Sequence, residues 1–405
     1  MPEPGAAPAA GGIGASAGAV ASWAAYLACS WTWCIGMFLP VLLVRDFGLA
    51  GFLVFAAPNV LGAAAMGWVL RDAHASERLL LEHATATRLF SIVTILFHAF
   101  FLAWLARSWW GVTLPAVGVA LAAFTATTFF ALATPATQRR AGLALWIVAI
   151  ASAALLVPAW LPDDALHPAR GALPEGHAIP LAAVCVLGFG LCPYLDLTFH
   201  RARRELSPGG ARAAFGIGFG VLFLAMIVLT LLYRGAFLGE AGVSPRSLPL
   251  VLSAHLLVQS VYTAGVHLRE LARHPAPEGV APAGCAAACA LFVAAIVGAL
   301  ALGATVEPMQ SVADASRLGS GEIAYRAFMS AYGLAFPAYV WVCVVPRGRW
   351  AVPPRVARLA WLGAVVAASP CLALGFLARE TWWLVPGVGI VLVAPLVARA
   401  LSSRW

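Results

Sequence analysis

Long apolar runs separated by short polar segments make up nearly the whole chain. Because a helix needs roughly 20 apolar residues to cross a bilayer, each run has room for one transmembrane helix. The twelve runs cover approximately residues 19–44, 48–70, 88–107, 111–134, 141–160, 178–200, 212–233, 248–270, 283–305, 322–345, 355–378 and 382–401. No segment between them is long enough for a soluble domain. The pattern predicts an all-α polytopic membrane helix bundle of about twelve transmembrane helices.

Glycine and proline interrupt the first run within residues 33–40 and the sixth run within residues 188–194. Unwound backbone survives in a membrane only where protein buries it or a wet cavity faces it, because unpaired N–H and C=O groups are costly in hydrocarbon. Paired interruptions in corresponding helices of two halves are typical of the substrate site of a transporter. We therefore expect the two interruptions to meet near the middle of the bilayer.

The two interrupted runs are the first helices of two five-helix halves. Because five is an odd number of crossings, a second half of five helices is inverted relative to the first. The predicted organisation is a disordered tail at 1–18, repeat 1 at 19–160, an outer loop at 161–177, repeat 2 at 178–345, and two additional helices within 346–405.

The composition excludes a soluble globular protein, since 62% of the residues are hydrophobic and only 10% are charged. All 25 basic residues are arginine, and 17 of them lie in the tails and in the loops after even-numbered helices. The positive-inside rule then predicts a protein of the plasma (inner) membrane with both termini cytoplasmic. The net charge of +8 lies in short loops, so no nucleic-acid partner is expected. The eight cysteines lack metal-ligand spacing, so neither a metal nor a cofactor is expected.

Short motifs in the first two runs add to this picture. Residues 36–40 read Gly-Met-Phe-Leu-Pro, residues 47–52 read Phe-Gly-Leu-Ala-Gly-Phe, and Pro58 and Asn59 follow in the next helix. With the interruption at 188–194, the chain resembles the LeuT-fold secondary transporters of the amino acid–polyamine–cation superfamily, which includes the sodium:solute symporters. The resemblance implies alternating access, in which helices 1, 2, 6 and 7 rock against helices 3, 4, 8 and 9. No subfamily is indicated.

The resemblance also implies a substrate site between helices 1, 3, 6 and 8. A helix that restarts at Met37 or Phe38 would direct free N–H groups and a positive dipole end at this site. The residues expected to bind substrate are Trp33, Cys34, Gly36, Met37, Phe38, His98, Gly188, Gly190, Cys192, Tyr194 and His255. For the aromatic members of this set, plain packing is the alternative interpretation.

By the same resemblance, carbonyl groups of residues 30–33 would share a sodium ion with hydroxyl groups of Ser260 and Thr263 in helix 8. Asp196 lies inside the sixth run, where a charge usually faces a cavity or a partner. It is interpreted either as a proton or cation site or as a structural partner of His200, one turn later. The residues expected to couple an ion are Ser30, Trp33, Asp196, Ser260 and Thr263. Sodium, a proton and no ion at all remain open.

Two further pairs of polar residues each have a functional and a structural interpretation. His98 and His255 occupy similar depths in helices 3 and 8, and either imidazole can titrate near neutral pH. A histidine bonded to a backbone carbonyl is the plainer interpretation of each. Glu322 and Arg326 are spaced either for an external gate pair or, more simply, for a solvated ion pair at a helix end.

Three functions are compatible with these features. The main hypothesis is a secondary active transporter that moves a small solute across the bilayer by alternating access. A membrane-embedded enzyme acting on a lipid or lipid-linked substrate is an alternative, although the chain has no His-Glu-x-x-His pair, and we expect no enzyme activity. The other alternative is a transporter-like ligand sensor. The substrate and the oligomeric state are left open by the sequence.

Overall fold

The computed structural model describes residues 16–110, 114–160, 171–174, 176–238, 250–274, 282–346 and 348–402. Most of the predicted tail at 1–18 and of the predicted outer loop at 161–177 lies outside these ranges. Within them the chain is helical, as predicted, with no strand.

The first part of the chain, up to residue 160, forms six helices. They are α1 (Ala17–Trp31), α2 (Cys34–Val69), α3 (Ala73–Glu82), α4 (Ala84–Trp110), α5 (Leu114–Leu132) and α6 (Pro135–Trp160). Asp72 caps the short helix α3, since its carboxylate accepts a hydrogen bond from the Ala75 N–H.

The second part repeats the pattern of one interrupted helix followed by longer ones. Its elements are α7 (Ala178–Leu191), the 3-10 turn η1 (Cys192–Leu195), α8 (Leu197–Glu205), α9 (Pro208–Ile217), the π-helical turn η2 (Gly218–Phe223), α10 (Leu224–Leu238), α11 (Leu250–Arg273), α12 (Pro282–Thr305) and η5 (Met309–Ala313). A long helix with two π-helical turns follows, made of α13 (Ser320–Ser330), η6 (Ala331–Ala335), α14 (Phe336–Tyr339) and η7 (Val340–Val344). The chain ends with η8 (Gly348–Trp350), α15 (Pro354–Phe376), η9 (Thr381–Trp383) and α16 (Leu384–Ser402).

The predicted boundary between the first two runs is confirmed at Gly48, inside α2. Gly48 has φ of 61° and ψ of −153°, a conformation that breaks the helix and that favours glycine. Three residues on, Gly51 passes so close to the Leu43 carbonyl that a Cβ would lie 2.3 Å from its oxygen. The segments of α2 on either side of Gly48 are therefore two successive helices.

The outer surface shows that the bundle is an integral membrane protein. Among the described residues, eight helices are long and apolar enough to cross a membrane, against the twelve predicted. Helix α12 is apolar on all faces, yet Leu291, Val293 and Val297 are more than half exposed. A helix that is hydrophobic all round needs an apolar surrounding, which for an exposed helix is lipid.

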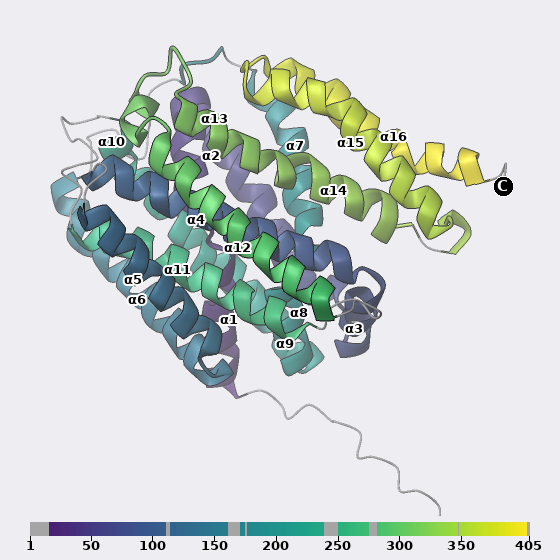
Figure 1. Ribbon diagram of the computed structural model, residues 1–405, viewed down its shortest axis with the longest axis horizontal. Coiled ribbons are helices and arrows are strands. Elements are labelled where there is room, and N and C mark those ends of the chain that lie inside the picture. Colours follow the sequence, from purple (N-terminus) through teal and green to yellow (C-terminus); the bar gives the residue numbers. More distant parts are fainter. Residues whose placement is uncertain are drawn as a thin grey trace, which may run out of the picture.

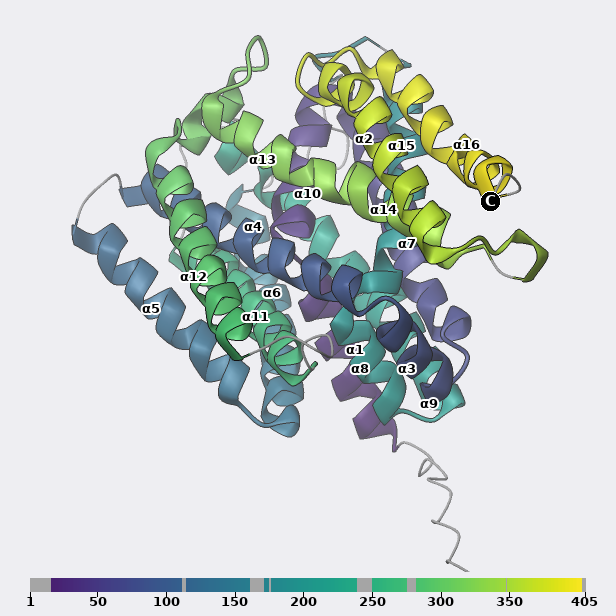
Figure 2. The ribbon, with the colours of Figure 1, turned by 45° about the vertical axis from the view of Figure 1, so that its right-hand side comes forward.

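The helices pack in two groups (Figure 1). Helix α2 packs against α7, α9 and α10, whereas α4 packs against α12 and α11 packs against both α4 and α5. Helix α1 contacts both groups, through η2 and α9 on one side and α11 on the other. Figure 2 shows α12 lying along α4, and the α15–α16 pair at the opposite edge of the molecule from α5.

Candidate functional site

The first interruption lies at Thr32 and Trp33, between α1 and α2. Trp33 is extended, and helix α2 restarts at Cys34, with its first helical hydrogen bond from the Met37 N–H to the Trp33 carbonyl. The predicted restart at Met37 or Phe38 was therefore wrong by one turn. The chain unwinds earlier because the Gln259 side chain binds the free carbonyl group of Thr32.

Polar side chains of α11 bind the carbonyl groups at the end of α1. The Gln259 amide donates to the carbonyls of Thr32, at 3.0 Å, and Cys29. The Thr263 hydroxyl also donates to Cys29, at 3.1 Å. Because both neighbours of the amide are carbonyl oxygens, its NH2 group must face them. Ser260, predicted beside Thr263, instead bonds back to Leu256 within its own helix.

The N-terminal end of α2 meets His98 of α4. The Cys34 N–H donates to Nε2 of His98 at 3.3 Å, and the His98 Nδ1–H donates to the Thr94 carbonyl at 2.7 Å. These two bonds fix the neutral tautomer of His98. His255 is buried one turn before Gln259 on α11, and no bond joins it to either interruption among the described residues.

The second interruption extends from Cys192 to Asp196. Helix α7 continues through Gly188 and Gly190, and Asp196 adopts an extended conformation before α8. The Oδ1 atom of Asp196 caps α8 by accepting bonds from the N–H, at 2.7 Å, and the hydroxyl, at 2.6 Å, of Thr198. Gly188 is needed for packing, since a Cβ there would lie 2.9 Å from the Tyr332 carbonyl oxygen.

The two interruptions lie against each other. The hydroxyl of Thr198, at the start of α8, is 3.1 Å from that of Ser30, in the last turn of α1. The rings of Trp31 and Phe199 are 4.9 Å apart. Neither interrupted helix runs straight through, and the ends meet in the centre of the bundle. A small cavity here is lined by Trp31, Trp33, Ile35, Gly36, Asn59, Phe189, Cys192 and Tyr332.

Several residues predicted for the substrate site form the walls of this junction. Trp33 packs against Trp31 and Tyr332, and the Cys192 thiol donates to the Tyr332 carbonyl at 3.3 Å. Phe38 instead packs one turn further along α2, among Phe101, Trp104, Phe237 and Tyr325. The Met37 carbonyl accepts a bond from Tyr233, and the Tyr194 carbonyl faces Nε2 of His200.

Asp196 does not pair with His200, contrary to one of its two predicted interpretations. The ring of His200 lies between the Ser76 hydroxyl, at 2.8 Å, and the Tyr194 carbonyl, at 2.9 Å. The Oδ2 atom of Asp196 instead faces Nε2 of His267 on α11, 3.9 Å away. His267 was not predicted, because the partner lies 71 residues away along the chain and no local spacing marks it.

A larger cavity leads away from the junction. Its volume, measured as the space open to the centre of a water molecule, is about 60 Å³. Its inner end shares Phe189 and Tyr332 with the small cavity, and its outer end is lined by Asp46, Arg326 and Arg379. Most of the remaining lining is apolar: Leu39, Leu43, Phe47, Leu173, Leu181, Val184, Cys185, Met329 and Phe376. The larger cavity therefore extends from the neighbourhood of the second interruption to a charged cluster.

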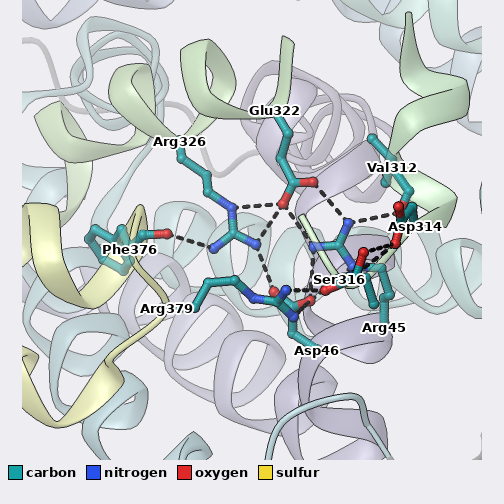
Figure 3. A network of polar contacts seen from close by, with 10 residues as sticks. Arg45, Asp46, Val312, Asp314, Ser316, Glu322, Arg326, Phe376 and Arg379 are labelled. Atoms are coloured by element: carbon teal, nitrogen blue, oxygen red, sulfur yellow. Dashed lines mark hydrogen bonds and ion pairs between the residues drawn. The ribbon is translucent and has the colours of Figure 1, made fainter. Parts of the chain in front are cut away.

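That cluster is a buried network of five charged side chains (Figure 3). Arg45 forms two bonds of 2.8 Å to the Glu322 carboxylate. Asp46 accepts bonds from Arg326 at 2.6 Å and from Arg379 at 2.9 Å. The predicted interpretation of Glu322 and Arg326 as a solvated pair was wrong, since the Glu322 side chain is 0% exposed. Arginines from α2 and from the segment after α15 cover the pair.

Comparisons with known proteins identify no family for this chain. The sequence matches no family model and no curated protein. Among solved structures, the chain is similar to Mhp1, described as a nucleobase-cation-symport-1 family transporter, in a closed conformation with bromovinylhydantoin bound. The TM-score is 0.49 and the identity 13%, over 95% of this chain and 92% of that chain. Against the inward-facing conformation of Mhp1 the TM-score is 0.44, with 13% identity over 95% and 90% of the two chains.

The arrangement of this chain's own helices agrees with the predicted resemblance to the LeuT fold. Two interrupted helices, α1–α2 and α7–α8, meet in the centre of an apolar bundle. These features define the class of protein as a polytopic membrane protein with a transporter-like fold.

Proposed function

We propose that this chain is a secondary active transporter that moves a small solute across the membrane by alternating access. The observation that carries the proposal is the contact between the two interrupted helices, at Ser30 and Thr198, beside a cavity that both of them line. Interrupted backbone is tolerated in a membrane only where it serves a buried or wet site. The embedded position of Asp196, at 0% exposed, disfavours the lipid-facing groove that an enzyme would need.

The topology that we propose has twelve crossings. The kink at Gly48 divides α2, so that α1 and the first part of α2 form one interrupted crossing and the rest of α2 forms the next. Residues 19–160 then form one repeat of five crossings, residues 178–345 form an inverted repeat, and α15 and α16 are additional. The arginine distribution places both termini in the cytoplasm.

The moving parts follow from the packing groups. One unit comprises α1, α2 and α7–α10, and the other comprises α4, α5, α11 and α12. The bonds from Gln259 and Thr263 to Cys29 and Thr32 hold α1 against α11. The network around Asp46 and Glu322 closes the outer end of the large cavity. Alternating access needs contacts on the two sides of the site that break in turn.

The direct test is uptake. The purified full-length protein is reconstituted in liposomes, and a panel of labelled amino acids, amines, nucleobases and organic acids is screened under imposed sodium or proton gradients. We expect at least one solute to accumulate or exchange above protein-free liposomes. A solute that binds but never crosses the membrane would favour the sensor over the transporter.

Gly36 provides a test of the site itself. A Cβ at Gly36 would lie 3.4 Å from Phe223 and 3.6 Å from Thr32, which is ordinary contact, whereas a longer side chain would overfill the small cavity. We expect Gly36→Leu to abolish uptake of the solute found in the screen, with overpacking of about 1–3 kcal/mol. The matched control is Gly36→Ala, which should keep uptake. Unimpaired transport by Gly36→Leu would remove this residue from the site.

A further inference from the structure

Asp196 and His267 face each other inside the bundle, beside the backbone of Ser30 and Phe199. Both side chains are 0% exposed. The Oδ1 atom of Asp196 is bonded to Thr198, but its Oδ2 atom and the Nε2 atom of His267 lack a hydrogen-bond partner among the described residues. The two atoms are 3.9 Å apart. A carboxylate and an imidazole buried in this way are costly unless something bridges them.

One proton satisfies both atoms. The distance of 3.9 Å is longer than a hydrogen bond, so the side chains must approach by about 1 Å to form one. With one proton, the pair becomes either a carboxylic acid donating to imidazole or an imidazolium donating to carboxylate. The second ring nitrogen, Nδ1, is 3.2 Å from the Ser91 hydroxyl, which can donate or accept. Either tautomer of the ring is therefore accommodated.

The neighbouring ionisable groups do not neutralise the negative charge of the unprotonated Asp196 carboxylate. Arg201 is engaged by Glu270 in a buried ion pair. The ionisable groups that interact with Asp196 are Tyr26 (α1), Glu270 (α11) and Tyr332 (η6), and His98 (α4) interacts with His267. Cys34 (α2), Cys192 (η1), His200 and Arg201 (α8) and Arg269 (α11) are other ionisable groups on the elements packed around the pair. His98 and His200 already have bonds to both ring nitrogens.

We propose that Asp196 and His267 bind one proton between them, and that this proton stabilises the closed junction of the two interrupted helices. This proposal rests on the proposed function, because it assigns the coupling ion of the same junction. Asp196 reaches α1 through Thr198 and Ser30. The ring of His267 packs edge-on against Trp33, with centroids 5.7 Å apart. Movement of either interrupted helix therefore changes the distance between the proton-binding atoms.

The proton balance is simple. One proton enters from water when the junction opens on one side, occupies the space between Oδ2 and Nε2, and leaves to water when the junction opens on the other side. No bond other than that to the proton forms or breaks. Without the added proton, the Nε2–H tautomer of His267 can donate to Asp196, but the buried pair keeps one negative charge. The added proton cancels that charge, so the protonated form is the more stable closed form.

Infrared difference spectroscopy tests proton binding without a solute. The full-length protein in lipid is titrated, and the C=O band of a protonated buried carboxylic acid is followed. We expect one such band to disappear in Asp196→Asn and to shift in His267→Asn. It should stay unchanged in His74→Asn and Asp314→Asn, which alter exposed groups. A band that survives both site variants overturns the proposal, and the His267→Asn shift decides the matter if Asp196→Asn fails to fold.

Thiol labelling tests the coupling to the junction. In a variant that keeps Cys192 as its single cysteine, a water-soluble maleimide reports opening, because this thiol is 2% exposed when the junction is closed. Each labelling rate is divided by the rate of a free thiol at the same pH, because maleimide reacts with the thiolate. On this corrected scale, acid should slow labelling by about tenfold per pH unit over the range of the band, as expected for one linked proton. His267→Asn should remove this dependence. Labelling that follows sodium rather than pH, or that keeps its pH dependence in His267→Asn, overturns the proposal.

The two proposals fail in different ways. If uptake is never found but the carboxylic-acid band and its loss are, the proton pair stands and the transporter function falls. If uptake is found and is insensitive to pH and to both site variants, the transporter stands and the proton pair falls.

Discussion

Asp46→Ala should lower the free energy of unfolding by about 3–5 kcal/mol, the usual cost of removing one partner from a buried ion network. The Asp46 carboxylate accepts bonds from Arg45, Arg326 and Arg379. Without it, Arg45 and Arg326 share the single carboxylate of Glu322, and Arg379 loses its bond to Asp46. The shift in thermal unfolding of the purified protein in detergent, measured beside wild type, gives the effect.

The control is the same substitution at Asp314. This exposed carboxylate bonds only locally, to Ser316, so Asp314→Ala should change stability by no more than about 0.5 kcal/mol. A double variant, Asp46→Ala with Arg379→Met, should recover part of the loss because it removes one of the unpaired charges. Equal stability of Asp46→Ala and Asp314→Ala would mean that the network does not hold the outer end of the cavity together.

Gly62→Val should have the second large effect, because it separates α2 from α7. A Cβ at Gly62 would lie 2.2 Å from the carbonyl oxygen of Phe189 and 3.1 Å from the Cα of Gly190. These are backbone atoms, which cannot turn aside as a side chain can. The expected loss exceeds the roughly 1–3 kcal/mol typical of overpacking, and the displaced end of α7 leads directly into the second interruption.

The yield of monodisperse protein and its thermal unfolding measure this effect. Gly298→Val is the matched control, since a Cβ at Gly298 in α12 would meet no atom within 4 Å. It should fold like wild type. If both valine variants behave alike, then close contact of the α2 and α7 backbones is not what positions the second interruption.

The helices were predictable because they depend on local sequence. The second interruption, expected within residues 188–194, lies instead at residues 192–196, because α7 continues through Gly188 and Gly190. Length and apolar character define a membrane helix, and the positive φ of Gly48 ended a helix where the glycine-rich turn indicated. The first interruption was placed one turn late, because glycine and proline express a preference that packing overrides. The chain unwinds instead at Thr32 and Trp33, where the polar side chain of Gln259 takes over the carbonyl groups.

The pairings in the site depend on contacts between distant parts of the chain, so they were not predictable. Glu322 and Arg326 are visible as a pair at helical spacing, but their burial depends on Arg45 and Asp46, more than 270 residues earlier. Likewise, Asp196 stands out as a charge in an apolar run, whereas its partner His267 is recognisable only in three dimensions. Gln259 was not predicted either, because its partners Cys29 and Thr32 lie more than 220 residues earlier.

The hydrogen bonds from the Gln259 amide, which hold α1 against α11, differ from a bound ion in how they respond to salt. An ion held by the same carbonyl groups would come and go with the salinity of the medium, and its occupancy would fall on dilution. A group tethered to the chain has a fixed local concentration. The hydrogen bonds from Gln259 to Cys29 and Thr32 therefore have the same strength at low and at high salt concentration. They break only when α1 and α11 move apart.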